Sequence, residues 1–454
     1  MAEVVEKLSD KERYLKALAR CSREDAPAWL RAVRENGAKR FEAMRFPTHK
    51  DEEWRFTDVR PIVHGTFEPA LETSYEAIDP NLLAPYLFAK EGWTELVFVD
   101  GTFAPELSHV NPSANLHAGS LAEMALNNGA VAQQYLDKIV GDTTNIFNAL
   151  NSASVSDGAV VHVRRGHAPE SPVHVLYVTT ENQENRAVHP RNLVVLDATA
   201  QLTLVESYIG LTDAPYFNNA VTEMSLGDGA ILNRYKVLHE GAHGYHLSSA
   251  RAHQAQNTVF RSFSAFLGAR IGRNELRTSL KGEGAEASLS GLYLAEGEQL
   301  VDNATGVEHA SPRCTSRIRY KGVLSDTSHA VFSGSVYVHR GAQKTDSNQL
   351  NSNMLLSDKA TIDTKPLLEI FADDVKCTHG ATVGQPPRDQ IFYFQSRGIS
   401  EAMARALLTC GFAGEVVDDI AVEPLRLRLH DYIYNRYSPG QTATNGKADA
   451  HGSR

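Results

Sequence analysis

The feature that most constrains this sequence is a run of short β-type segments between about residue 155 and residue 355. VHVLYVTT, QLTLVESYIG and AVFSGSVYV are examples, and turns rich in Gly, Asp, Asn and Ser separate them. A doubly wound α/β sheet would need a helical pattern of about 10–15 residues between successive strands. No such pattern interrupts the run, so the sequence predicts a mainly β core.

A weak self-similarity marks the ends of several segments. A leucine closes the segment and a small polar turn leads to an alanine, with successive leucines 30, 54, 44 and 32 residues apart. The motifs are LDATA at Leu196, LGDGA at Leu226, LKGEGA at Leu280, LSDTSHA at Leu324 and LSDKA at Leu356. Such irregular spacing fits imperfect coils of a β-solenoid, in which each coil buries its face by stacking on the next. A β-sandwich is the competing architecture, but the lack of long return connections favours the solenoid.

Helical patterns flank this core. Ser9 is suited to cap one helix, Pro27 to begin a second, and Ser400 to precede a third that Gly411 would end. FPTHKDEEWRFTDV (Phe46–Val59) breaks the first pattern and predicts an aromatic-anchored loop that covers the next domain. The expected division is a mostly helical region with a short strand segment (1–150), the solenoid (151–385), a C-terminal helical region (386–437) and a disordered tail (438–454).

Composition excludes several classes of protein. A net charge of −10 and a pI near 6.0 argue against nucleic acid as the main partner. The charged N-terminus lacks a signal core, and no apolar run is long enough to span a bilayer. Cys21, Cys314, Cys377 and Cys410 are too few and too far apart for a disulfide framework. We therefore expect reduced thiols and a location in the cytoplasm, or in an organelle.

Nucleotide-binding motifs are incomplete. GAQKT (Gly341–Thr345) lacks the glycine that must precede a P-loop lysine, and LGARIGR (Leu267–Arg273) lacks the third glycine of a dinucleotide fingerprint. The chain is therefore expected to bind no nucleotide. The adjacent Asp373 and Asp374 fit a solvated turn, because neighbouring strand residues point to opposite faces. Surface or turn positions are expected for His239, His243, His246 and His253.

Cys377 and His379, in KCTHG, are the candidate metal ligands. In a strand, two side chains at this spacing leave the same face, which pairs a thiolate with an imidazole. Two ligands do not complete a site, and a buried cysteine often serves only as a small hydrophobic residue. Cys314 is a possible further thiol, with packing as its alternative role.

The surrounding block resembles the SufB/SufD family of scaffold proteins for iron–sulfur cluster assembly. GAQKTDSNQLNSNMLLSDKATIDTKPLLEIFADDVKCTHGATVGQ and IFYFQSRGISEAMARALLTCGF carry the resemblance, which extends from about Asn257 to Phe412. FPTHKDEEWRFTDV and LVFVDGTFAPELS are similar to the N-terminal part of the SufD branch. The resemblance implies a right-handed parallel β-helix flanked by helical regions, in agreement with the predicted solenoid.

The resemblance also implies partners and roles. Members form a complex with SufB and the ABC-type ATPase SufC, which hydrolyses the ATP, so this chain would be a non-enzymatic subunit. The end of the β-helix would pair with SufB, and a transient iron–sulfur cluster would be built near that junction with His379 and its companion Cys377. The C-terminal helical part, about Arg397–Tyr437, would contact SufC. Candidate contact residues are Arg397, Gly398, Ile399, Arg405 and Leu408.

Three alternatives remain open from the sequence. The chain is either SufD-like or a SufB-branch primary scaffold, and the shortage of cysteines favours the former. It could also be a purely structural stabiliser of SufB, without a ligand role for His379. A β-helix carbohydrate-active enzyme would need paired carboxylates in a groove, and the sequence shows no convincing pair. For a family member the expected location is the cytoplasm or the plastid stroma.

Overall fold

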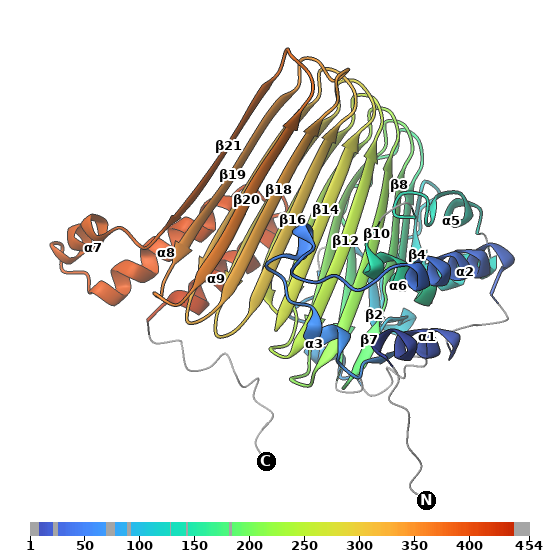
Figure 1. Ribbon diagram of the computed structural model, residues 1–454, viewed down its shortest axis with the longest axis horizontal. Coiled ribbons are helices and arrows are strands. Elements are labelled where there is room, and N and C mark those ends of the chain that lie inside the picture. The colour runs from blue at the N-terminus through green and yellow to red at the C-terminus, as the bar shows by residue number, and fades with distance from the viewer. Residues whose placement is uncertain are drawn as a thin grey trace, which may run out of the picture.

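The computed structural model describes residues 9–20, 26–69, 78–88, 92–127, 129–141, 144–180 and 184–439. Its centre is a β-solenoid of about eight turns over residues 160–384, with helices on both flanks (Figure 1). The predicted mainly β solenoid with terminal helical regions is therefore confirmed. The sandwich alternative is wrong, because successive coils stack through parallel strands instead of forming two antiparallel sheets.

Each coil contributes one strand to each of two sheets, which we call sheet A and sheet B. Sheet A has the order β20-β18-β16-β14-β12-β10-β8-β5-β4, and sheet B the order β21-β19-β17-β15-β13-β11-β9-β6-β2-β3. The strands of sheet A are β4 (Leu116–Ser120), β5 (Ala159–Val163), β8 (Arg191–Leu196), β10 (Tyr216–Leu226), β12 (Gly244–Gln254), β14 (Ile271–Leu280), β16 (Leu300–His309), β18 (His329–Val338) and β20 (Thr361–Ile370), with the short β1 (Glu68–Pro69) and β7 (Arg186–Val188) beside β10. The strands of sheet B are β2 (Thr94–Val99), β3 (Thr102–Phe103), β6 (Val173–Thr179), β9 (Gln201–Gly210), β11 (Ile231–His239), β13 (Val259–Gly268), β15 (Glu286–Ala295), β17 (Thr315–Leu324), β19 (Asp346–Leu355) and β21 (Lys376–Gly384).

The leucine–turn–alanine motifs form corners of the solenoid. Leu196, Leu226 and Leu280 end strands of sheet A, whereas Leu324 ends a strand of sheet B and Leu356 follows one. The alanine that follows each turn is buried, as are the leucines that end the strands. Two different corners therefore use the same motif. This explains the irregular spacing, because paired residues on successive coils, such as Val259 and Glu286 or Thr315 and Asp346, are a nearly constant distance apart in sequence.

The interior of the solenoid is apolar along most of its length but contains buried charge. Arg234 forms an ion pair with Glu206, and His246 Nδ1 lies 2.6 Å from Glu240 Oε1, with all four side chains almost fully buried. The predicted surface or turn position of His246 is therefore wrong. His246 shares the face of β12 that carries Ala250 and Ala252, two residues of the main hydrophobic core, so its side chain points inward. The carboxylate of Glu240 compensates the cost of burying it.

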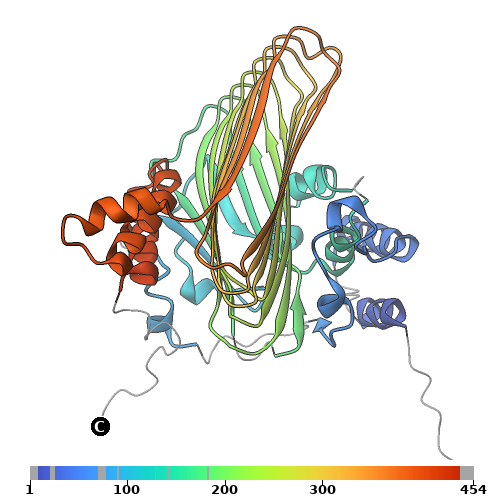
Figure 2. The same cartoon turned by 60° about the vertical axis from the view of Figure 1, so that its left-hand side comes forward.

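The N-terminal helices cover the outer face of sheet A (Figure 2). They are α1 (Asp10–Arg20), α2 (Ala28–Ala43), α3 (Arg60–Val63), α4 (Leu121–Asn127), α5 (Ala130–Tyr135) and α6 (Ile146–Ser154), with a 3₁₀ turn at η1 (Glu52–Trp54). The 3₁₀ turns η2 (Pro80–Leu82) and η4 (Pro105–Leu107) lie at sheet B instead, where Leu83 and Leu107 pack with Val97. Ser9 caps α1 as predicted, since its hydroxyl accepts from the Glu12 N–H and Glu12 accepts from the Ser9 N–H. The stretch from Ser120 to Val140 has a helical sequence pattern, but it forms the two short helices α4 and α5 and not one long helix.

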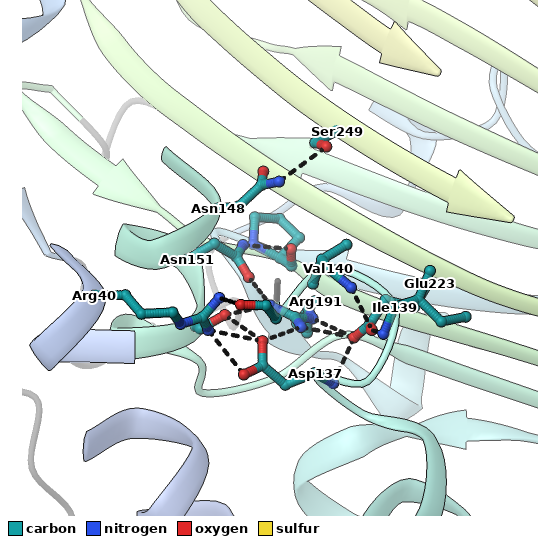
Figure 3. A network of polar contacts seen from close by, with 12 residues as sticks. Arg40, Asp137, Ile139, Val140, Asn148, Asn151, Arg191, Glu223 and Ser249 are labelled. Carbon is teal, nitrogen blue, oxygen red and sulfur yellow. Dashed lines mark hydrogen bonds and ion pairs between the residues drawn. The ribbon is translucent and has the colours of Figure 1, made fainter. Parts of the chain in front are cut away.

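A buried polar network fastens this N-terminal region to the solenoid (Figure 3). The Arg191 guanidinium on β8 donates to Glu223 Oε1 on β10 at 2.6 Å and to Asp137 Oδ1 at 3.1 Å. Arg40 on α2 donates to the other oxygen of Asp137 at 2.8 Å. The Glu223 carboxylate also accepts from the backbone N–H groups of residues 137, 139 and 140. A single cluster thus joins two solenoid strands, α2 and the loop after α5.

The segment Phe46–Val59 crosses the outer face of sheet A, as predicted for an aromatic-anchored cover. The Trp54 ring lies 4.2 Å from the guanidinium carbon of Arg273 on β14, and Thr57 donates to Asp302 on β16 at 2.5 Å. Glu52 reaches Lys365 on β20. This segment therefore ties the N-terminal region to the last coil of the solenoid.

The C-terminal helices lie on the side of sheet B, opposite the N-terminal helices (Figure 2). Helices α8 (Glu401–Val417) and α9 (Glu423–Tyr437) pack at the outer face of the sheet, and α7 (Arg388–Gln395) contacts α8. The predicted helix stop at Gly411 is wrong, because α8 continues through it to Val417. Val416 and Val417 pack against sheet B, and this burial outweighs the weak helix propensity of glycine. Most of the predicted disordered tail lies outside the described residues. No described helix has the length and apolarity needed to span a membrane.

Candidate functional site

In the described part of the chain, no further strand pairs with the last coil of the solenoid. Among the described strands, β20 pairs only with β18 and β21 only with β19, so the outer backbone edges of both sheets are unpaired (Figure 1). Large apolar side chains are exposed on or beside these last coils, at 36–53%. They are Tyr337, Leu350, Leu367, Ile370, Phe371 and Val383. We call this surface the open end; unpaired strand edges combined with apolar side chains are typical of a surface that receives a partner.

Cys377 and His379 both lie on β21, the final strand of the open end. Their register partners on β19 are Ser347 and Gln349, each only 1% exposed, whereas the intervening Asn348 is exposed. Paired residues of parallel strands point to the same side of the sheet, so Cys377 and His379 face the interior of the solenoid at its mouth. The register of β21 therefore gives the two side chains the same orientation, which their spacing in the sequence also predicts.

The environment of the two side chains differs. Cys377 is half-buried against the main hydrophobic core, whereas His379 is exposed. Burial raises the pKa of the Cys377 thiol, the backbone N–H of Ser347 opposes this rise, and the charge of Asp346 adds to it. The thiol is therefore protonated at neutral pH, and binding to a metal would have to release that proton. Among the described residues, no group of three or more His, Cys, Asp or Glu side chains could hold a metal ion.

Two polar residues of the last two coils were not singled out from the sequence. Gln349 Oε1 and Thr364 Oγ1 are buried and have no hydrogen-bond partner within the described part of the chain. Gln349 is next to His379 in register, and Thr364 occupies an inward-facing position on β20. An acceptor at this place is suited to orient an imidazole through its N–H. The sequence feature that could have identified Gln349 is the alternation of polar residues in SNQLNSN, which puts amides where a core strand normally carries apolar side chains.

Cys314 is not part of this cluster. It lies fully buried in the corner before β17, two coils away from β21, and its thiol donates to the Gly282 carbonyl at 3.4 Å. Burial raises the pKa of the Cys314 thiol. Its environment is that of a packed thiol.

The C-terminal helices form a second apolar surface. Exposed side chains on it are Phe392, Tyr393, Met403, Leu407, Leu427 and Tyr434, of which Phe392 is the most exposed at 70%. Of the candidates from the sequence, three lie at the turn between α7 and α8 and two on α8. Arg397 stacks on Tyr393 at 4.5 Å, Gly398 has a φ of +83°, and Arg405 is exposed in an ion pair with Glu401; Ile399 and Leu408 are half-buried.

Comparison with known proteins covers nearly the whole chain. Residues 11–175 match the family model "SufBD protein N-terminal region", and residues 177–412 match "SUF system FeS cluster assembly, SufBD core domain". An iron–sulfur cluster assembly SufBD family protein of Synechocystis sp. is 33% identical over 88% of this chain and 89% of its own length. The iron–sulfur cluster assembly protein SufD of Escherichia coli is 32% identical over 87% of this chain and 90% of its own length. A chloroplastic protein of Arabidopsis thaliana, ABCI7, is 28% identical over 89% of this chain and 85% of its own length.

Proposed function

We propose, from the premise that this chain belongs to the SufBD family of iron–sulfur cluster assembly proteins, that it is the SufD-like subunit of a complex with SufB and SufC. In this role it is a non-enzymatic scaffold that helps to build and release iron–sulfur clusters. The observation that carries the proposal is the position of Cys377 and His379 at the mouth of an uncapped solenoid.

The open end is the proposed surface for SufB. Its two unpaired strand edges can continue their ladders with strands of a second β-solenoid, since main-chain hydrogen bonds are what edge strands lack. Exposed apolar side chains such as Ile370 and Val383 would be buried in the same step. A partner that completes the solenoid in this way would also close the space above Cys377 and His379.

The nascent cluster is the cargo of this junction. Thiolates are the usual ligands of iron–sulfur clusters, and histidine replaces cysteine in some of them. One cysteine and one histidine supply only part of a coordination shell, so SufB would supply the rest. Coordination divided between two chains also suits release, because separating the chains removes ligands from the cluster.

The apolar surface of α7–α9 is the proposed contact with SufC. Arg405 and Leu407 lie on its exposed part, and both side chains point away from the packing of α8 against sheet B. ATP binding and hydrolysis then belong to SufC. Helix α8 would link the bound SufC to the solenoid of this chain, because Glu415 on α8 pairs with Lys321 on β17.

The double variant Arg405→Glu/Leu407→Glu tests this division of surfaces. We expect it to weaken SufC binding at least about tenfold, because it reverses one charge and places another where an apolar side chain would be buried. SufB binding should be unchanged. Co-purification of the three chains, followed by native mass spectrometry, measures both. Leu126→Glu, on the distant α4, is the control. Retention of SufC by the double variant would refute the assignment.

The second candidate, a purely structural stabiliser of SufB, shares both surfaces and differs only in the role of His379. The Gln349 side chain beside His379 favours the ligand role. Its Nε2 donates to the Gly334 carbonyl, but its buried Oε1 has no partner among the described residues, and a site used only for packing gains nothing from such an atom.

A further inference from the structure

The opposite end of the solenoid carries a cavity that is unrelated to the open end. It has a volume of about 550 Å³ and lies between β4 and β5 on one side and α4 and α5 on the other. His117 and Glu123 are among its lining residues, together with His162 on β5 and Arg164 directly after that strand. Its size is in the range of ligand sites.

The two histidines face each other across the β4–β5 ladder. His117 is the direct register partner of His162 in this antiparallel pair, which brings the Cβ atoms of such residues to about 4.5–5.5 Å. Val161 and Val163, the neighbours of His162, point into the solenoid core, so both imidazoles leave the outer face and enter the cavity.

A carboxylate orients one of the two rings. His162 Nε2 lies 3.2 Å from Asp197 Oδ1, which leaves Nδ1 of the same ring for another contact. A histidine that binds a metal commonly holds a carboxylate on its other nitrogen, which fixes the ring and strengthens it as a ligand. Glu123 adds a negative charge to the wall of the cavity, and Arg164 adds a positive one at its exposed edge.

We infer that this cavity binds one divalent first-row transition-metal ion through His117 and His162. Imidazole nitrogens are good ligands for such ions. Because no third potential protein ligand joins them among the described residues, water would complete the coordination. The inference does not rest on the proposed function, and its test uses the isolated chain.

The test is calorimetric titration with Zn²⁺ of the full chain carrying Cys377→Ser and His379→Ala, so that the open end contributes nothing. We expect one ion per chain. His117→Gln and His162→Gln should each weaken binding at least about tenfold, and Asp197→Asn about tenfold. Arg164→Gln should tighten binding, because it removes a repelling charge. The matched control is His329→Gln, since His329 also pairs with a carboxylate, Asp363 at 2.8 Å, but has no facing histidine.

Visible absorption of bound Co²⁺ gives a second readout, measured in the chain that carries Cys377→Ser and His379→Ala and retains His117 and His162. Absorption bands that saturate at one equivalent support the site, whereas the spectrum of aqueous Co²⁺ would contradict it. Equal Zn²⁺ affinity in the His117, His162 and His329 variants would overturn the inference. So would binding of inorganic phosphate that displaces Zn²⁺ and is lost in Arg164→Gln, because that result identifies an anion site.

Discussion

Replacing Ile370 and Val383 together by arginine is expected to reduce the affinity for SufB at least about 100-fold, which corresponds to about 2.7 kcal/mol or more. Both side chains face the mouth of the solenoid and are 38% and 49% exposed. In the proposed complex they would be buried between two solenoids. Two guanidinium groups at that junction would lose their hydration without gaining partners, and this cost exceeds the loss of the apolar contacts.

The measurement is a pull-down with SufB, quantified by interferometry at constant ionic strength. The matched control is Leu82→Arg/Leu126→Arg, which adds the same charge at exposed apolar positions of the N-terminal region. SufC should bind both double variants equally well. Undiminished SufB binding by Ile370→Arg/Val383→Arg would remove the open end as the partner surface.

Arg191→Ala is expected to destabilise the chain by about 3–5 kcal/mol, the usual cost of breaking a buried ion pair from one side. The guanidinium is fully buried and donates to Glu223, Asp137, Asn151 and Ser152 (Figure 3). Without it, the Glu223 carboxylate keeps only its three backbone N–H donors in a buried site. The loop after α5 and the helices that it holds should then separate from sheet A before the solenoid unfolds.

Urea unfolding followed by tryptophan fluorescence measures this effect, because two of the three tryptophans, Trp29 and Trp54, lie in the segments that cover sheet A. Arg405→Ala is the control: its ion pair with Glu401 is exposed on α8, and its loss should cost less than about 1 kcal/mol. A free energy of unfolding for Arg191→Ala within 1 kcal/mol of the parent value would show that the network does not anchor the region.

Local features of the fold could be predicted from the sequence because they depend on neighbouring residues. Alternation along QLTLVESYIG predicts a strand, and β9 has those bounds. The leucine–turn–alanine motifs identified corners, although not which of the two corners each one forms. Assigning a motif to one corner or the other requires knowledge of how the chain runs through a whole coil. The stop expected at Gly411 failed for a similar reason: the burial of Val416 and Val417 on sheet B is a tertiary effect.

The candidate site was predictable only in part. The spacing of Cys377 and His379 predicts a shared face, but their position at the mouth depends on the absence of a further coil above β21 in the described chain. Gln349 and Thr364 lie about 30 and 15 positions before His379 in the sequence. Only the stacking of coils relates such distant residues to one another, and no local sequence pattern contains that information. Likewise, the pairing of His117 with His162 joins strands that are separated by three helices.

The central claim is that His379 contributes to cluster building, and one measurement tests it most directly. The chain is co-purified with SufB and SufC, as the parent, as His379→Ala and as the control His329→Ala, whose histidine lies on β18 in an ion pair with Asp363. Native mass spectrometry gives the assembly of each complex, and iron and acid-labile sulfide are quantified in the same samples. We expect equal assembly in all three complexes, with iron and sulfide lost only in His379→Ala. Unchanged iron and sulfide in that variant would contradict a ligand role for His379 and leave the chain a structural partner of SufB.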